Sequence, residues 1–227
     1  MPPRPGIAQD HGLGDPPAVG ALGTRTLTLE GLRRHFANAA PPAEPVYGDE
    51  GARPERESLP PASVLVPIVA HEAALTMLFT RRAAHLRDHS GQVSFPGGRA
   101  APCDPSPEAT ALRESHEEIG LERARVELLG RLPEYRTRTG FRITPVVGVV
   151  APPLGLRPDA NEVEEIFEVP LDFLLDPANY QRQSREWQGE LRWFFAMPYE
   201  RHYIWGATAG MLVNFARHLS QGSSRAR

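Results

Sequence analysis

Residues 97–121 read GGRAAPCDPSPEATALRESHEEIGL, a glycine pair followed by a proline-bearing loop and a segment with a helical pattern. Within that segment Glu114, Glu117 and Glu118 stand at positions i, i+3 and i+4, so a helix would place them on one face. Like charges on one stripe repel each other unless a hard cation lies among their oxygens. The pattern therefore favours a divalent-metal site over its alternative, an acidic helix face that is simply solvated.

The spacing predicts a helix from about Pro107 to Gly120. Proline suits the first turn of a helix, where an N–H group would have no partner, and Glu108 would lie at the positive end of the helix dipole. Gly120 can end the helix because glycine readily adopts the left-handed conformation of a helix C-terminus. The acidic stripe would then occupy the second half of a helix with well-defined ends.

The segment from Gly98 to Leu121 resembles the Nudix box, Gly-x5-Glu-x7-Arg-Glu-aliphatic-x-Glu-Glu-x-Gly-aliphatic, the signature of hydrolases that cleave diphosphates linked to another moiety. Three positions depart from that pattern. Asp104 stands in place of the first Glu, eight residues instead of seven separate it from Arg113, and Ser115 replaces an aliphatic residue. The resemblance implies a Nudix fold of the mixed α/β (α+β) class, in which a mixed β-sheet is sandwiched between helices.

Hydrolysis of a diphosphate needs charge neutralisation and a positioned water, because the charged oxygens of a phosphoanhydride repel a nucleophile. Mg²⁺ or Mn²⁺ would supply both. We expect Glu114 and Glu118, one helical turn apart, to be the metal ligands, with Glu117 as a further ligand or a holder of water. We expect Arg113 to pair with a carboxylate of the box and hold its rotamer, with direct phosphate contact as the alternative.

Family analogy implies that Gly97 and Gly98 let backbone groups approach the ion and the diphosphate closely. Nudix enzymes also often take one more carboxylate, as metal ligand or general base, from a distant loop or strand. The expected source is residues 161–168, which read NEVEEIFE. Strict strand alternation would place Glu162 and Glu165 on opposite faces, and the sequence leaves the choice between these two catalytic candidates open.

Residues 78–98 carry a second motif, LFTRRA-x3-R-x3-G-x3-FPGG. The motif is similar to one that marks coenzyme A diphosphatases within the Nudix family, with Phe79 where the pattern has Leu. Arg82 and Arg87 supply planar, permanently charged groups suited to phosphate oxygens, such as those of the ribose 3′-phosphate of coenzyme A. The alternative for these arginines is pairing with surface acids.

The resemblance implies metal-dependent hydrolysis of coenzyme A or acyl-coenzyme A to 4′-phosphopantetheine, or its acyl form, and adenosine 3′,5′-bisphosphate. The alternatives are a Nudix hydrolase for another nucleoside diphosphate derivative and a non-catalytic nucleotide-binding module of the same fold. Loss of the acidic residues of the box would indicate the binding module, whereas Glu114, Glu117 and Glu118 are all present.

Composition narrows the classes of partner. The net charge of −3 argues against a nucleic-acid partner, and the absence of Lys excludes Schiff-base chemistry. Cys103, the single cysteine, excludes an intrachain disulfide. Because no apolar run reaches membrane-spanning length and the N-terminus has no signal-peptide core, we expect a cytoplasmic protein with a small-molecule substrate and no membrane partner. The oligomeric state is not indicated.

Three regions are expected along the chain: a Pro/Gly-rich N-terminal extension with a short helix (1–60), a Nudix hydrolase domain (61–220) and a disordered tail (221–227). Leu27, Leu29, Leu32 and Phe36 give the extension its amphipathic helical pattern. Apolar runs predict a hairpin of strands 63–69 and 75–80. Further expected elements are strands at 93–95, 125–131, 142–150, 162–169 and 188–197, and a C-terminal helix at 205–219.

Overall fold

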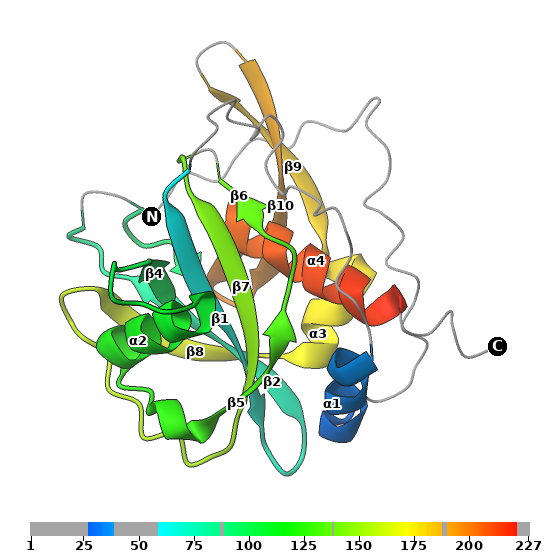
Figure 1. The fold of residues 1–227 in the computed structure, drawn as a ribbon. Helices are drawn as coiled ribbons and strands as arrows, with labels where there is room; N and C mark the ends of the chain where they lie inside the picture. Colours follow the sequence, from blue (N-terminus) through cyan, green and yellow to red (C-terminus); the bar gives the residue numbers. More distant parts are fainter. Residues whose placement is uncertain (1–26, 39–58, 87–88, 138, 188–189, 222–227) are drawn as a thin grey trace.

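The computed structural model describes residues 27–38, 59–86, 89–137, 139–187 and 190–221 (Figure 1). The helices are α1 (Leu29–Asn38), α2 (Pro107–Ile119), α3 (Leu171–Leu175) and α4 (Gly206–Gln221), with 3₁₀ turns η1 (Arg123–Arg125) and η2 (Pro177–Asn179). The strands are β1 (Pro61–Ala70), β2 (Leu75–Arg82), β3 (Val93–Ser94), β4 (Gly97–Arg99), β5 (Val126–Arg131), β6 (Tyr135–Arg136), β7 (Arg142–Val150), β8 (Val163–Pro170), β9 (Gln181–Trp187), β10 (Glu190–Tyr199) and β11 (His202–Trp205). None of these helices is long and apolar enough to cross a membrane.

The main sheet is mixed, with strand order β3-β2-β1-β7-β5 and with β4, β6 and β8 paired to β1, β7 and β2. Strands β1 and β7 run parallel, whereas β1 and β2 form the antiparallel hairpin that the sequence predicted. A second, three-stranded sheet has the order β11-β10-β9. The expected fold, a mixed sheet between helices, is confirmed.

Strand β1 is buried on both faces, which explains its continuous apolar sequence. Val64, Val66 and Ile68 pack into the larger hydrophobic cluster, which includes residues of α4. Leu65 and Val69 point the other way and pack against residues of α2. Figure 1 shows α2 on one side of β1 and β7 and α4 on the other. The sheet therefore holds α2 in a fixed position.

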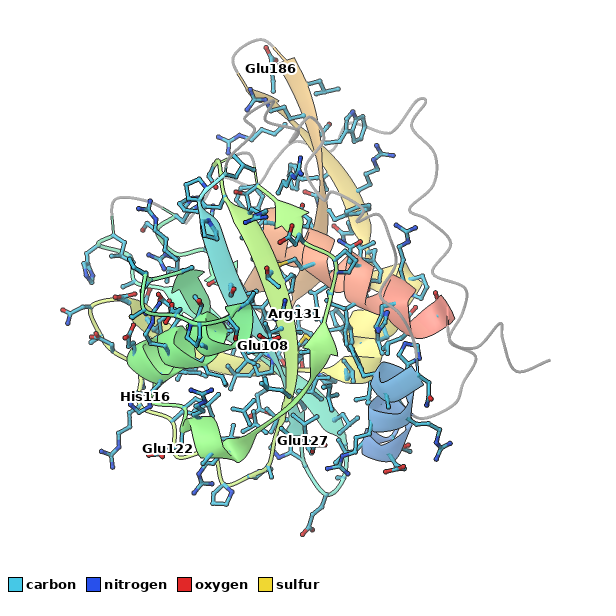
Figure 2. All side chains as sticks on the ribbon, in the orientation of Figure 1. Glu108, His116, Glu122, Glu127, Arg131 and Glu186 are labelled. Atoms are coloured by element: carbon cyan, nitrogen blue, oxygen red, sulfur yellow. The ribbon has the colours of Figure 1, made fainter. Side chains whose placement is uncertain are left out.

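Both ends of α2 have the chemistry expected of them. The Ser106 side chain accepts a hydrogen bond from the Ala109 N–H at 3.3 Å, and Pro107 occupies the first turn. Gly120 adopts φ 67°, and its N–H donates to the His116 carbonyl at 2.9 Å. The predicted helix is confirmed. An ion pair between Glu108 and Arg131, which face each other in Figure 2, also ties α2 to β5.

The strict alternation expected for residues 162–168 is wrong because β8 contains a β-bulge. Arg81 and Arg82, successive residues of β2, lie opposite Glu165 and Val163, so Glu164 is an extra residue in β8. A bulge of this kind breaks the two-residue period of a strand. Side chains before and after Glu164 therefore do not alternate between the two faces of the sheet in a single register.

The packing of β8 shows the consequence of the bulge. Val163 and Ile166, three residues apart, both pack into the hydrophobic cluster on the α2 side of the sheet. Regular alternation would have sent them to opposite faces. Phe167 packs on the other side, against Phe79.

The second sheet was largely missed by the sequence analysis, which expected one strand there and a helix beginning at residue 205. Trp205 instead ends β11, where it pairs with Ala196 of β10, and α4 begins one residue later. The turn that joins β10 to β11 is formed by Glu200 and Arg201, with Glu200 at φ 50°. Neither residue carries the glycine or asparagine signal by which such turns are usually recognised.

Helix α1 of the N-terminal extension packs onto the folded body, as its apolar pattern predicted. Leu32 is fully buried in the larger cluster, and Phe36 packs beside it. The Arg33 guanidinium donates to both oxygens of Glu127 in β5 at 2.7 and 2.8 Å. The domain limits of 61 and 220 stay a prediction. The tail was expected to begin at residue 221, but Gln221 is the last residue of α4, and residues 222–227 lie outside the described residues.

A pair of histidines joins α1 to α4. The rings of His35 and His218 meet edge to face with 4.7 Å between their centroids, and the ring centroids of Phe36 and His218 are also 4.7 Å apart. His218 is 1% exposed, and neither of its ring nitrogens has a hydrogen-bond partner. Burial, with the charge of His35 as a second cause, lowers the pKa of His218 to about 4.

We predict that His218→Leu stabilises the protein and that the gain is larger at pH 5 than at pH 7.5. Between its ordinary pKa near 6.5 and its folded pKa of about 4, the unfolded chain binds a proton that the folded His218 does not. The free energy of unfolding of the wild type therefore decreases as pH falls through this range. Urea unfolding should show a difference of about 1–3 kcal/mol between the variants at pH 5.

His116→Leu serves as the control for this measurement, because His116 is exposed on α2. It should leave the free energy of unfolding nearly unchanged at both pH values. A His218→Leu variant whose stability difference from wild type is the same at pH 5 and pH 7.5 would contradict the prediction.

Candidate active site

The glycine pair that precedes α2 brings backbone and carboxylates into close contact. A Cβ atom on Gly98 would overlap the Glu114 carboxylate, and one on Gly97 would overlap the Ser63 carbonyl of β1. Gly97 also has φ 151°, which side chains disfavour. Residues other than glycine would push the loop away from α2. The structure thus brings the two loop glycines and the helix carboxylates together, while the expected approach of the glycine backbone to an ion and a diphosphate stays a prediction.

Glu118 is the most buried carboxylate of the box, with 4% of its surface exposed. One oxygen accepts a hydrogen bond from the Gly97 N–H at 3.0 Å, and the Arg82 guanidinium lies 3.9 Å from the other. Burial raises the pKa of Glu118 to about 7, and the charges of Glu162 and Glu114 also raise it. The site therefore holds a carboxylate whose negative charge is only partly compensated.

Glu114 lies one turn earlier on α2 and is also partly buried. Burial raises its pKa above the ordinary range, and the charges of Glu117 and Glu162 act in the same direction. The Arg113 guanidinium, 2.9 Å from a carboxylate oxygen of Glu114, partly offsets these effects. Two neighbouring carboxylates that are both costly to ionise are well suited to a cation between or beside them.

Arg113 holds several groups of the site in place. Its Nη1 lies 2.8 Å from Glu117 and 2.9 Å from Glu114, and its Nη2 donates to the Arg99 carbonyl at 3.0 Å. Its Nε and Nη2 bind both oxygens of Asp104 at 3.0 and 2.9 Å. The guanidinium therefore ties α2 to the loop before it, the arrangement expected of a residue that fixes carboxylate rotamers.

Asp104 is a component of the site to which the sequence analysis gave no role. Besides Arg113, it accepts hydrogen bonds from the Ala101 N–H at 2.8 Å and from the Thr110 hydroxyl at 3.0 Å. The Arg113 hydrogen bonds hold the pKa of Asp104 well below its usual range. The position of Asp104 in the Nudix box was the signal in the sequence for such a role. The extra residue between Asp104 and Arg113 does not prevent their contact.

The structure separates the two candidate carboxylates from residues 161–168. The charge of Glu162 raises the pKa of both Glu114 and Glu118, the two residues of the carboxylate cluster, and the Glu162 carbonyl accepts a hydrogen bond at 2.9 Å from the N–H of Ala83, the residue after Arg82. Glu165 lies with Arg81, Arg201 and His202 instead. Although burial raises the pKa of Glu165, its hydrogen bonds to Arg201, His202 and Arg81 lower it to about 2.

The structure describes only one of the two arginines of the second motif. Arg82, 29% exposed at its side chain, lies beside Glu118 and therefore on the side of the carboxylate cluster. Arg87 lies outside the described residues. Glu117, 56% exposed and bound to Arg113, is at the margin of the cluster.

The donor set fits a cation that keeps much of its own hydration. Within the part of the chain that the structure describes, no three Asp, Glu, His or Cys side chains converge as a closed metal cage. Mg²⁺ does not require such a cage, because it commonly binds through one or two carboxylates together with waters and substrate phosphates. Glu114 and Glu118, one turn apart on α2 and both partly or fully buried, supply carboxylates of that kind.

Comparison with known proteins finds a matching family and similar chains. Residues 59–194 match the NUDIX domain family. The chain is 42% identical over 164 residues to an uncharacterized Nudix hydrolase, NudL, of Pectobacterium atrosepticum, covering 70% of this chain and 82% of the relative. NudL of Escherichia coli strain K12 is 39% identical over 155 residues, covering 68% and 80%. A Nudix hydrolase from M. smegmatis, RenU, is 26% identical with a TM-score of 0.42, covering 49% of this chain and 70% of that one.

The family match and these relatives define a hydrolase that acts on phosphoanhydride bonds. The chain belongs to the Nudix family. Members of this family act on nucleoside diphosphate derivatives and generally use divalent cations.

We predict that Glu118→Gln stabilises the metal-free protein more at pH 8 than at pH 5. Between about pH 4.5 and 7 the folded protein retains a proton on Glu118 that the unfolded chain has released, so this group's contribution to wild-type stability falls as pH rises. Glutamine has no such ionisation. In EDTA, thermal or urea unfolding should show a pH-dependent difference of about 1–3 kcal/mol between variant and wild type. A difference that is the same at both pH values would contradict the pKa assignment.

Proposed function

We propose that the protein hydrolyses the diphosphate bond of coenzyme A or acyl-coenzyme A. The products would be 4′-phosphopantetheine, or its acyl form, and adenosine 3′,5′-bisphosphate. The observation that carries the proposal is the position of Arg82, a residue of the 78–98 motif, beside Glu118 at the carboxylate cluster. A guanidinium there supports binding of a substrate with a phosphate in addition to its diphosphate.

In the proposed reaction water adds to one phosphorus, the bridging P–O bond breaks, and the water's proton is transferred to a basic group. Glu114 and Glu118 would hold Mg²⁺ or Mn²⁺, which when bound neutralises phosphate charge and acidifies water. Glu162, beside this cluster, is the proposed base or further ligand. Its exposure leaves it open to solvent, whereas the ion pairs of Glu165 occupy that carboxylate.

Of the two roles expected for Glu117, holding water fits better than binding the metal. Its carboxylate is bound to Arg113 at 2.8 Å and is more than half exposed. The backbone of Gly97 and Gly98 lies where it could approach the diphosphate, because no side chain intervenes between it and α2. We propose that Arg113 is a positioning residue that keeps the Glu114 carboxylate in place.

Hydrolysis of another nucleoside diphosphate derivative, such as a sugar nucleotide or a dinucleotide, is the second candidate. It would use the same carboxylates but would not need a cation for a 3′-phosphate. Mass spectrometry of the products from a panel of diphosphates incubated with Mg²⁺ separates the two. Release of adenosine 3′,5′-bisphosphate from coenzyme A supports the first candidate, and cleavage of other diphosphates without coenzyme A supports the second.

We predict that Glu114→Gln and Glu118→Gln each lower kcat by about 10²-fold or more, because an amide lacks the charge that a metal ligand must supply. Both variants should remain folded, since the change relieves repulsion between carboxylates. Excess EDTA should abolish turnover of the wild type. Wild-type kcat in either variant at saturating Mg²⁺ would remove that residue from the metal site.

We predict that 3′-dephospho-coenzyme A is a poorer substrate than coenzyme A by about 10- to 150-fold in kcat/KM, from one lost charge-assisted contact. Arg82→Ala should reduce this preference about tenfold or more. Because Arg82 also lies near Glu118, the ratio of the two kcat/KM values is the measurement, since damage to the metal site would lower both.

Arg34→Ala is the control for the preference, because Arg34 is exposed on α1 and pairs only loosely with Glu30 at 3.8 Å. It should leave the ratio unchanged. A wild-type enzyme that cleaves both compounds equally would refute the role of the 3′-phosphate, and an unchanged ratio in Arg82→Ala would refute the role of Arg82.

A further inference from the structure

The β-bulge in β8 is held by one arginine. Arg81 Nη1 donates to Glu164, the extra residue of the bulge, at 3.0 Å, and Arg81 Nε donates to Glu165 at 3.0 Å. The same guanidinium thus binds two consecutive carboxylates from the opposite strand. A surface ion pair normally joins one acid and one base, whereas this guanidinium bridges two consecutive residues of β8.

Glu165 is anchored a second time from the other sheet. Its remaining oxygen accepts hydrogen bonds from Arg201 and from His202 Nε2, the latter at 3.2 Å. The His202 ring is buried and stacks on Phe167 with 3.6 Å between centroids and 4° between planes. Both oxygens of Glu165 are therefore bound, one of them by a buried histidine, and Arg81 links this residue to Glu164.

The bulge also sets where the chain leaves β8 toward the carboxylate cluster. Directly before it, the Glu162 carbonyl accepts a hydrogen bond from the Ala83 N–H at 2.9 Å. Regular pairing continued from Arg81 opposite Glu165 would place Val163, not Glu162, opposite Ala83. The extra residue thus moves Glu162 one position along β2, next to Arg82.

The loop that carries Glu162 is fixed at its other end by α2. The Asp159 N–H donates to the Glu118 carbonyl at 2.8 Å, and the Asp159 carbonyl accepts from the Val163 N–H at 2.8 Å. Between this anchor and the bulge only a short turn remains. The position of the Glu162 carboxylate relative to Glu118 therefore depends on the bulge keeping its register.

We propose that Arg81 is a positioning residue for the hydrolysis, which acts by clamping the bulge so that Glu162 keeps its place opposite Ala83, next to Arg82. The inference rests on the catalytic role proposed above for Glu162. Arg81 does not touch the carboxylate cluster, since its guanidinium is bound to Glu164 and Glu165. Removing the clamp should change catalysis through Glu162 rather than substrate binding.

The test is a double-mutant cycle between Arg81→Lys and Glu162→Gln. Lysine keeps the charge but lacks the planar fork that reaches two acceptors at once. With the diphosphate that wild type cleaves fastest, Arg81→Lys should lower kcat about five- to twentyfold and change KM less than twofold, as expected for a misplaced catalytic group. In the Glu162→Gln background the same substitution should lower kcat less than about twofold further.

Arg33→Lys is the matched control, because Arg33 binds both oxygens of Glu127 between α1 and β5. It should alter the melting temperature without altering kcat. If Arg81→Lys does not fold, Glu164→Gln replaces it in the cycle, because it removes the charge bound by Arg81 Nη1 and keeps the side-chain volume.

The outcomes are distinct. An unchanged kcat in Arg81→Lys, or an equal loss with and without Glu162, overturns the positioning role and leaves the proposed function standing. Wild-type activity in Glu162→Gln overturns both the role of Glu162 and the positioning inference. A wild-type enzyme that does not cleave coenzyme A refutes the proposed substrate alone, since the cycle uses whichever diphosphate is cleaved.

Discussion

The close approach of the Gly97-Gly98 backbone to α2 is the constraint on which the site depends. Without side chains at these two positions, the loop lies against the Glu114 carboxylate and the Gly97 N–H reaches Glu118. The approach excludes water from Glu118 and thereby makes its negative charge costly. Arg113 and the sheet beneath α2 keep the helix in this position. The chemistry of the site thus follows from backbone packing before any cation or substrate binds.

The fold could be predicted where the sequence carried strong local signals. Pro107 and Gly120 marked the ends of α2, and the apolar run of β1 marked a strand covered on both faces. The turn at Glu200 and Arg201 carried no such signal, because its positive φ is adopted by an ordinary side chain. Strand β11 was missed for that reason, although the strand that precedes the turn, β10, was expected.

In the candidate site too, contacts within one helix could be predicted from the sequence, whereas contacts between distant segments could not. Helical spacing was enough to predict that Glu114 and Glu118 lie together, because the helix geometry relates them directly. Choosing between Glu162 and Glu165 was not possible, because the β-bulge changes the alternation and its two carboxylates pair with Arg81 in another strand. The segment between Asp104 and Arg113 is one residue longer than in the Nudix pattern, so spacing alone does not predict their contact.

The burial of Leu32 and the histidine contact between α1 and α4 have a consequence for the limits of the family domain. The region that matches the family, residues 59–194, contains neither Leu32 nor Phe215 of α4, although both are buried in the larger core. A chain trimmed to that region would expose the sheet face opposite α2 to water. The hydrophobic core therefore extends beyond the residues that define the family, and part of its packing is supplied by segments that the family signature does not include.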